Sequence, residues 1–136
     1  MPRFVLLEHD HPALHWDFML ESGETLKTWR LPEPFVTADV HPVQELQHLS
    51  ENEIKLTVVQ LPDHRMRYLE YEGPVSGDRG FVKRIDQGMY IPLMQSEICW
   101  ELRLEGEQSS GFLSLSRKNS NSPKEWELIY LPEQRE

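Results

Sequence analysis

Apolar and polar residues alternate through many short segments of this chain, which is the pattern of strands that bury one face. Between His15 and Glu21, the apolar residues Trp16, Phe18 and Leu20 occupy every second position. Successive side chains of a strand point to opposite faces, so these three are expected to pack inward. The segment therefore predicts a half-buried strand.

The same patterning continues along most of the chain. A turn is expected at Ser22-Gly23, and further strands are expected at residues 3–8, 25–31, 54–60, 65–71, 81–85, 98–104, 111–116 and 125–130. Several short strands at close spacing predict an all-β barrel or sandwich. Residues 37–50 differ, because Val43, Leu46 and Leu49 have helical spacing, and a short helix or ordered loop is expected there.

Composition narrows the classes of protein that fit. The 136 residues suit a single domain over residues 1–136, and 38% hydrophobic residues with four Trp argue against disorder. A formal net charge of −9 argues against a protein that coats nucleic acid with clustered Lys and Arg, although a local basic pocket is compatible with it. Cys99 is the single cysteine, and no leader or membrane-length apolar run is apparent, so a cytoplasmic protein is expected.

One segment carries residues with metal-binding chemistry. His15 and Asp17 are two positions apart on a predicted strand, so both project from the face opposite Trp16. His9 ends the preceding strand, and a short connection can return the chain beside it. Two imidazoles and one carboxylate suit a divalent transition metal and leave positions for water and substrate. Solvated surface histidines are the alternative interpretation, because the chain has six histidines.

The order of these residues resembles the 3′-phosphoesterase domain of bacterial and archaeal DNA ligase D. That family carries a signature close to F-V-x-x-x-H-D-x-x-x-L-H-[YW]-D-[FL]-R-L-E, and after a short turn L-K-S-W-x-V-P. This chain reads FVLLEHDHPALHWDFMLE and then TLKTWRLP. Residues 63–73, 86–90 and 126–129 resemble three later family blocks, D-H-P-x-x-Y-x-x-[FY]-E-G, W-D-x-G-x-[YW] and W-x-L-I. The resemblance spans nearly the whole chain except residues 36–53.

The resemblance implies a compact antiparallel β-barrel of about eight strands. It places His9, His15 and Asp17 on the family's metal ligands, which usually hold manganese, with zinc, cobalt or another divalent ion as alternatives. It also places His64 and Tyr68 on the catalytic His and Tyr near the scissile phosphate. The implied reaction removes a 3′-terminal ribonucleoside and then the 3′-phosphate from a nucleic-acid end.

Several positions depart from the family pattern. Met19 stands where the family has an essential Arg, and a thioether cannot neutralise an anionic oxygen. Glu33 replaces a Lys, and Pro62 replaces an acidic residue. Thr28 falls on a phosphate-contacting Ser and retains its hydroxyl. Cations that can replace the missing guanidinium are Arg30, Lys55, Arg65, Arg67 and Arg117, and we expect Arg30 and Arg65 to contact phosphate together with Thr28.

Three functions remain open at this point. The first is a metal-dependent phosphoesterase that acts on a nucleic-acid 3′ end in DNA repair, with a separate DNA ligase or polymerase as a partner and no membrane. The second is a catalytically impaired binding module for a nucleic-acid end or a protein, which Met19 and the net charge favour. The third is a barrel metalloenzyme that acts on an unrelated small molecule.

Overall fold

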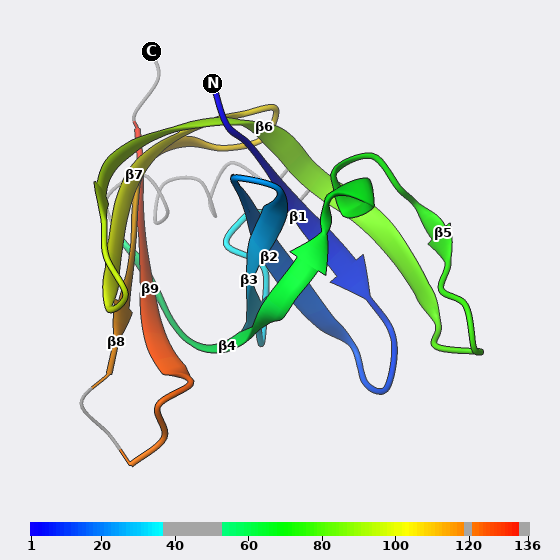
Figure 1. Ribbon diagram of the computed structural model, residues 1–136. Helices are drawn as coiled ribbons and strands as arrows, with labels where there is room; N and C mark the ends of the chain where they lie inside the picture. Colours follow the sequence, from blue (N-terminus) through cyan, green and yellow to red (C-terminus); the bar gives the residue numbers. More distant parts are fainter. Residues whose placement is uncertain (37–52, 119–120, 134–136) are drawn as a thin grey trace, which may run out of the picture.

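The computed structural model describes residues 1–36, 53–118 and 121–133. These residues form one antiparallel sheet in the order β1-β2-β3-β4-β9-β8-β7-β6, and β6 pairs back with β1 to close a barrel (Figure 1). A two-residue strand, β5, adds to the outer part of β6. The all-β fold expected from the alternation and the barrel of about eight strands implied by the family resemblance are both confirmed.

Most strands agree closely with the sequence pattern, but two extend further and the strand expected at residues 65–71 does not form. β4 and β6 continue well beyond residues 60 and 85, where the pattern ended them. The elements are β1 Arg3–His9, β2 His15–Ser22, β3 Thr25–Leu31, β4 Ile54–Arg65, the 3-10 helix η1 Met66–Leu69, β5 Gly73–Pro74, β6 Phe81–Gln95, β7 Cys99–Gly106, β8 Ser110–Arg117 and β9 Glu125–Pro132. The turn after β2 lies at Gly23-Glu24, one residue later than expected, with Gly23 at a φ of 63°. The helix or loop expected at residues 37–50 lies outside the described residues.

The two long strands close the barrel. β4 pairs with β9 along its first half and with β3 along its second, and β6 pairs first with β1 and then with β7. Register shifts interrupt the pairing of β1 with β6 and of β3 with β4. Such bulges bend a strand and increase its twist, which allows one strand to belong to both halves of a closed sheet.

The barrel interior holds the main hydrophobic core. Phe18 and Leu20 of β2 are fully buried in it, as the alternation predicts, and Trp16 packs against its edge. Trp29 lies at the centre, with its ring edge-to-face with Trp126 at 5.5 Å between ring centroids. Aromatic pairs of this geometry stabilise a core beyond the area they bury. The interior face of β2 is therefore confirmed.

A second, smaller core lies on the outside of the barrel, over β1 and β2. It contains Val5, Leu7, Met19, Leu26, Leu69 and Val82. The strand expected at residues 65–71 is wrong here, because the chain forms η1 instead and covers this patch. A 3-10 helix has three residues per turn, so Met66 and Leu69 point to the same side and both pack on it. No helix among the described residues is long and apolar enough to cross a membrane.

The block at residues 86–90 serves the fold rather than the predicted site. Asp86 is buried, and its carboxylate accepts hydrogen bonds from the backbone N–H groups of Gln87 (2.9 Å) and Gln108 (2.8 Å) and from the Ser109 hydroxyl (2.6 Å). Burial raises the pKa of Asp86 and outweighs these hydrogen bonds, which lower it. Gly88 has no room for a Cβ, which would press on the carbonyl of Glu105 across the strand pair. Asp86 thus fixes the β7–β8 turn to β6.

Replacing Asp86 tests this role. Asp86→Ala leaves three donors near a small cavity, so we expect the free energy of unfolding to fall by about 2–4 kcal/mol. Urea denaturation followed by tryptophan fluorescence measures the change. Glu97→Ala, an exposed acidic residue between β6 and β7, is the control and should stay within about 0.5 kcal/mol of wild type. Equal stability of the two variants would contradict the anchoring role.

Candidate metal centre

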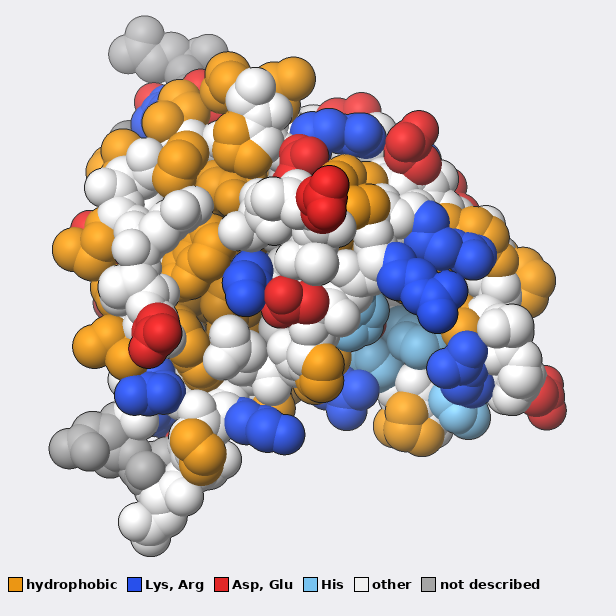
Figure 2. All heavy atoms as spheres, viewed as in Figure 1, with side chains coloured by type: hydrophobic (Ala, Val, Ile, Leu, Met, Phe, Trp, Pro, Cys, Tyr) orange, Lys and Arg blue, Asp and Glu red, His pale blue; other side chains and the backbone are white. Residues whose placement is uncertain are grey.

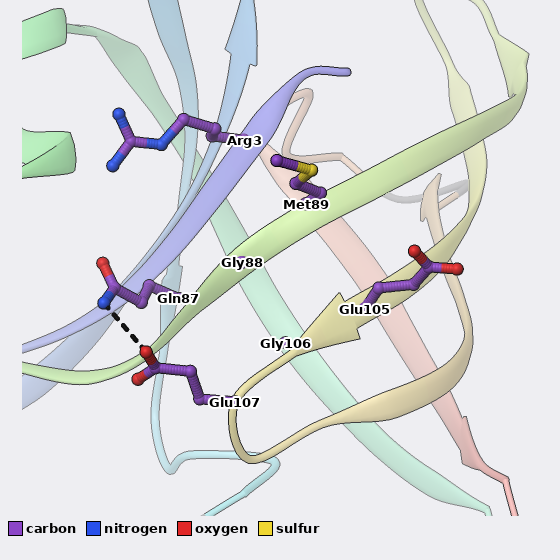
Figure 3. Close-up of a pocket in the computed structure, with 7 residues that line it drawn as sticks. All are labelled: Arg3, Gln87, Gly88, Met89, Glu105, Gly106 and Glu107. Carbon is purple, nitrogen blue, oxygen red and sulfur yellow. Dashed lines mark hydrogen bonds between the residues drawn. The ribbon is translucent and has the colours of Figure 1, made fainter.

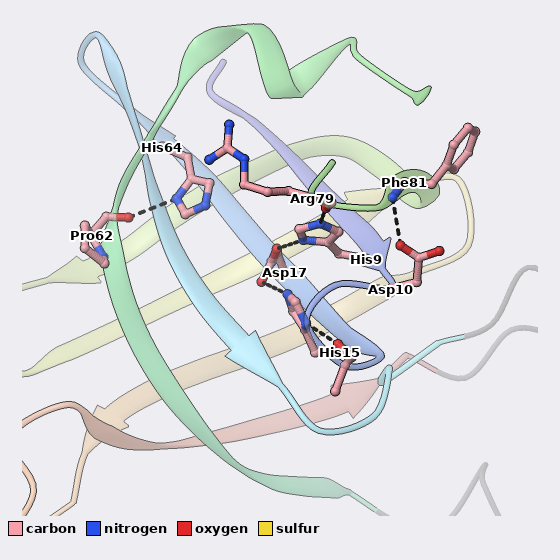
Figure 4. Close-up of polar contacts among 9 residues, drawn as sticks. His9, Asp10, His15, Asp17, Pro62, His64, Arg79 and Phe81 are labelled. Atoms are coloured by element: carbon pink, nitrogen blue, oxygen red, sulfur yellow. Dashed lines mark hydrogen bonds and ion pairs between the residues drawn. The ribbon is translucent and has the colours of Figure 1, made fainter. Parts of the chain in front are cut away.

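Strand register brings three potential ligands together at one end of the β1–β2 hairpin. His9, the last residue of β1, pairs directly with His15, the first residue of β2. Directly paired residues of antiparallel strands share a face, and Asp17 shares it too because it is two positions further along β2. All three side chains therefore project from the outer surface of the barrel (Figure 4).

The ligand atoms of these residues converge. One nitrogen from each of His9 and His15 and one oxygen of Asp17 all lie within 4.8 Å of one another. His9 Nδ1 is 3.8 Å from Asp17 Oδ2, and His15 Nε2 is 3.3 Å from Asp17 Oδ1. The convergence predicted from the sequence is present in the structure. An N, N, O set of this kind suits a divalent ion bound on one side and open on the other.

Backbone carbonyls fix which nitrogen of each ring faces Asp17. His15 Nδ1 lies 2.8 Å from the carbonyl oxygen of Ala13, and His9 Nε2 lies 2.8 Å from that of Arg79. A carbonyl only accepts, so these two nitrogens carry the hydrogens when the rings are neutral. His9 Nδ1 and His15 Nε2 then have lone pairs directed at the site. This is the outer-sphere arrangement of metal-bound histidines, in which the second ring nitrogen donates to a carbonyl.

Two buried atoms of the site have no hydrogen-bond partner among the described residues. They are His15 Nε2 and Asp17 Oδ1, which face each other. Buried polar atoms are nearly always satisfied, and these two, 3.3 Å apart, are satisfied together by a proton on His15 Nε2 or by a cation bound between them. Asp17 raises the pKa of His15, against the lowering effects of burial and of Arg30. The environment of this nitrogen therefore favours a positive charge, and a bound cation satisfies both atoms.

Solvent reaches the site mainly beside His9. The His9 side chain is 17% exposed, whereas those of His15 and Asp17 are 8% and 5% exposed. The outer face of β2 is polar at His15 and Asp17 and apolar at the next position on that face. Met19, the next residue on that face, is 1% exposed and belongs to the outer hydrophobic core. Met19 is thus a packing residue here.

His9, His15 and Asp17 are called the ligand group below. His64 and Tyr68 form a pair beside this group and are not part of it. His64 lies near the end of β4 opposite Leu26, which faces the outer core. Its Nδ1 is 2.9 Å from the Pro62 carbonyl oxygen, so its Nε2 points away from its own backbone. The rings of His64 and Tyr68 are edge-to-face at 5.9 Å between centroids. Figure 4 shows His64 on the same side of the barrel as His9 and Asp17.

The three predicted phosphate contacts occupy different environments. Arg30 is paired with Asp17 across β2 and β3, and its charge lowers the pKa of His15, so it belongs to the site. Thr28 is fully buried, and its hydroxyl donates to the Leu26 carbonyl. Arg65 is exposed at the far end of β4, opposite Thr25. Arg30 thus lies directly across from Asp17, whereas Thr28 lies opposite Met19 and Arg65 lies opposite Thr25.

Arg79 is the residue that sequence reasoning missed. It lies 70 positions after His9, and its carbonyl oxygen holds the His9 ring. A contact made by a backbone carbonyl does not depend on the side chain, so it leaves no motif in the sequence. The Arg-Gly pair at residues 79–80 was the one local feature that could have pointed to this position. Figure 2 shows Lys and Arg side chains gathered next to the histidines at the end of β1.

A shallow pocket of about 390 Å³ lies elsewhere, over β6 and β7 (Figure 3). Gly88 and Gly106 form its floor, and Arg3 stands at one side. Its Glu107 already accepts a hydrogen bond from Gln87 at 3.1 Å. None of the metal-ligand candidates lines it. The candidate ligands therefore lie outside this pocket, at the end of the β1–β2 hairpin.

Comparisons with known proteins identify the family of this chain. A family model described as the DNA Ligase D 3′-phosphoesterase domain matches residues 7–129. The chain is also 29% identical over 137 aligned residues to the Multifunctional non-homologous end joining protein LigD of Pseudomonas aeruginosa. That match covers 93% of this chain and 15% of the relative, so the chain spans a small part of its length. Because the family model matches most of the chain, the protein belongs to the DNA ligase D 3′-phosphoesterase domain family.

Proposed function

We propose that this protein is a metal-dependent phosphoesterase that acts on the 3′ end of a nucleic acid. The observation that carries the proposal is the convergence of His9, His15 and Asp17, with two buried ligand atoms that lack hydrogen-bond partners. Membership of a 3′-phosphoesterase domain family supports the reaction class. The substrates are a 3′-terminal ribonucleoside and a 3′-phosphate.

The three ligands would hold a divalent ion on the outer surface of the barrel. Manganese is the first candidate, and zinc, cobalt and other divalent ions also suit two imidazoles and a carboxylate. Such an ion polarises a phosphoryl oxygen and lowers the pKa of a bound water. The carbonyls of Ala13 and Arg79 keep both rings oriented toward the ion.

The neighbouring side chains supply the remaining functions. Arg30 lies across the strand pair from Asp17, where its charge can attract a phosphate. His64 has Nδ1 held by Pro62, so its Nε2 is directed outward to bind a phosphate oxygen or to protonate the leaving oxygen. Tyr68 packs edge-to-face against His64 and orients its ring.

The proposed substrate is a nucleic-acid end and not a long duplex. A formal net charge of −9 repels an extended phosphate backbone, whereas one terminal phosphate needs only the few cations near the site. The relative's name describes non-homologous end joining, which is consistent with DNA ends as the substrate class. A separate DNA ligase or polymerase would then act on the 3′-hydroxyl that this reaction leaves.

A binding module is the second candidate, and the position of Met19 favours it. Met19 is buried in the outer core on the same strand face as Asp17, so no cation stands there. A protein that binds a 3′ end without hydrolysing it would tolerate this change. Turnover separates the two candidates.

Metal binding is the first test. His15→Ala removes a ligand with a preoriented ring, so we expect the affinity for manganese to fall at least 100-fold. Isothermal titration calorimetry on the metal-stripped protein measures it. His11→Ala, a neighbouring histidine outside the ligand group, should keep the wild-type affinity. Similar affinities for the wild type and His15→Ala would contradict the site.

Hydrolysis is the second test. A labelled primer with a 3′-phosphate or a 3′-terminal ribonucleotide should be trimmed in the presence of manganese, and chelation should stop the reaction. We expect His64→Ala to lower kcat by about 10²–10⁴-fold, as loss of a general acid does. Electrophoresis of the products measures the rate. Binding of the primer without any turnover would establish the binding module instead.

A further inference from the structure

The loop between β5 and β6, residues 75–80, is built against the segment that carries the metal ligands. The backbone N–H of Phe81 donates to Asp10 Oδ1 at 2.7 Å, directly after this loop. Gly80 fits so closely that a Cβ there would press on Asp10 Oδ1 and lie 2.6 Å from the His11 Cβ. The carbonyl oxygen of Arg79 reaches His9 Nε2 at 2.8 Å. The loop therefore forms one wall of the site.

The loop has a fixed shape. The N–H of Val75 donates to the Gly80 carbonyl at 2.8 Å, and the N–H of Arg79 donates back to the Val75 carbonyl at 3.3 Å. Gly77, Asp78 and Gly80 have φ values of 75°, 57° and 81°, in the region that glycine adopts most readily. These contacts fold the loop back on itself and fix the direction in which Arg79 leaves it.

The Arg79 side chain is held in place, but no carboxylate neutralises it. Its Nε donates to the Ser76 carbonyl at 2.7 Å and its Nη2 to the Ser76 hydroxyl at 3.2 Å. No ion pair to Arg79 is found among the described residues, and its side chain is exposed. Figure 4 shows the side chain extending from the loop toward His64. The charged guanidinium thus lies on the same side of the barrel as His9 and His64.

Three other cations on this part of the barrel are already engaged by carboxylates. Arg84 lies 3.5 Å from Glu72, Lys27 lies 3.3 Å from Asp63, and Arg3 lies 3.9 Å from Glu70. Arg79 contrasts with these three, because its only side-chain contacts are neutral oxygens. Its charge is therefore available to an incoming anion.

We infer that Arg79 binds a phosphate oxygen of the nucleic-acid end that sits at the metal ligands, an assignment that rests on the proposed function. On β2, the next residue after Asp17 on the same face is the apolar Met19, which cannot neutralise a phosphate. The phosphate-binding cation is supplied instead by Arg79 of the β5–β6 loop. A guanidinium binds phosphate through a planar fork of donors, and Ser76 holds part of that fork before substrate arrives. Less side-chain entropy is then lost on binding.

Arg79 carries two separable functions. Its backbone carbonyl orients His9, and any side-chain substitution retains that carbonyl. Its guanidinium is the group that we infer binds phosphate, and a substitution removes this charge together with the two hydrogen bonds to Ser76 while the backbone hydrogen bonds of the loop remain. A side-chain variant should therefore change phosphate recognition without changing metal affinity.

Arg79→Gln tests the side chain. The readout is the ratio of affinities for an oligodeoxynucleotide with a 3′-phosphate and the same strand with a 3′-hydroxyl. Fluorescence anisotropy on ice with manganese measures both affinities, and electrophoresis checks that the ends stay intact. We expect the preference for the 3′-phosphate to fall about 10- to 100-fold, as loss of a charge-assisted hydrogen bond does, with manganese affinity within about twofold of wild type. Arg103→Gln, on the distant β7, is the control and should keep the preference.

Gly80→Ala tests the backbone function. A Cβ there pushes the loop away from Asp10 and moves the Arg79 carbonyl from His9, so manganese affinity should fall about 10- to 100-fold. Unchanged manganese affinity in Gly80→Ala would overturn this part, and circular dichroism checks that the variant folds.

The outcomes separate this inference from the proposed function. If wild type hydrolyses the 3′-phosphate and Arg79→Gln keeps its preference, the inference is overturned and the function stands. If wild type prefers the 3′-phosphate without hydrolysis and Arg79→Gln loses that preference, the inference stands and catalysis does not. A wild type with neither preference nor turnover overturns both.

Discussion

The pairing of His9 with His15 is the constraint on which the site depends. It is a matter of register: the last residue of β1 faces the first residue of β2. A shift of one residue would turn every side chain of one strand to the other face, which would bury His15 and Asp17 in the barrel and expose Phe18. The hydrophobic interior and the ligand group are therefore fixed by the same set of backbone hydrogen bonds.

The outer hydrophobic core shields the residues of the ligand group from solvent to different degrees. η1 and the β5–β6 connection cover the outside of β1 and β2, so His15 and Asp17 are nearly buried while His9 remains partly open. Charged and polar atoms in such surroundings interact more strongly than in water and must be satisfied. The facing atoms His15 Nε2 and Asp17 Oδ1, which lack hydrogen-bond partners, are therefore suited to share a cation. The same cover explains why Met19 is apolar.

The site is assembled from distant parts of the chain. β1 and β2 contribute the ligands, β3 contributes Arg30, β4 contributes His64, and the β5–β6 loop contributes Arg79. A closed barrel brings these elements onto one outer surface because β6 pairs back with β1. The block at residues 86–90 contributes indirectly, since Asp86 and Gly88 hold β6 against its neighbours.

The sequence by itself determined the strands whose two faces differ and the common face of His15 and Asp17, because alternation and i, i+2 spacing are local properties of a strand. It also determined the family, through motifs that surround His9, His15 and Asp17. Only the tertiary structure decided that residues 66–69 form η1, that Met19 is buried and that Arg79 reaches His9. Local alternation could not distinguish a strand from a 3-10 helix that packs on a second core, and a contact across 70 residues exists only once the barrel has closed.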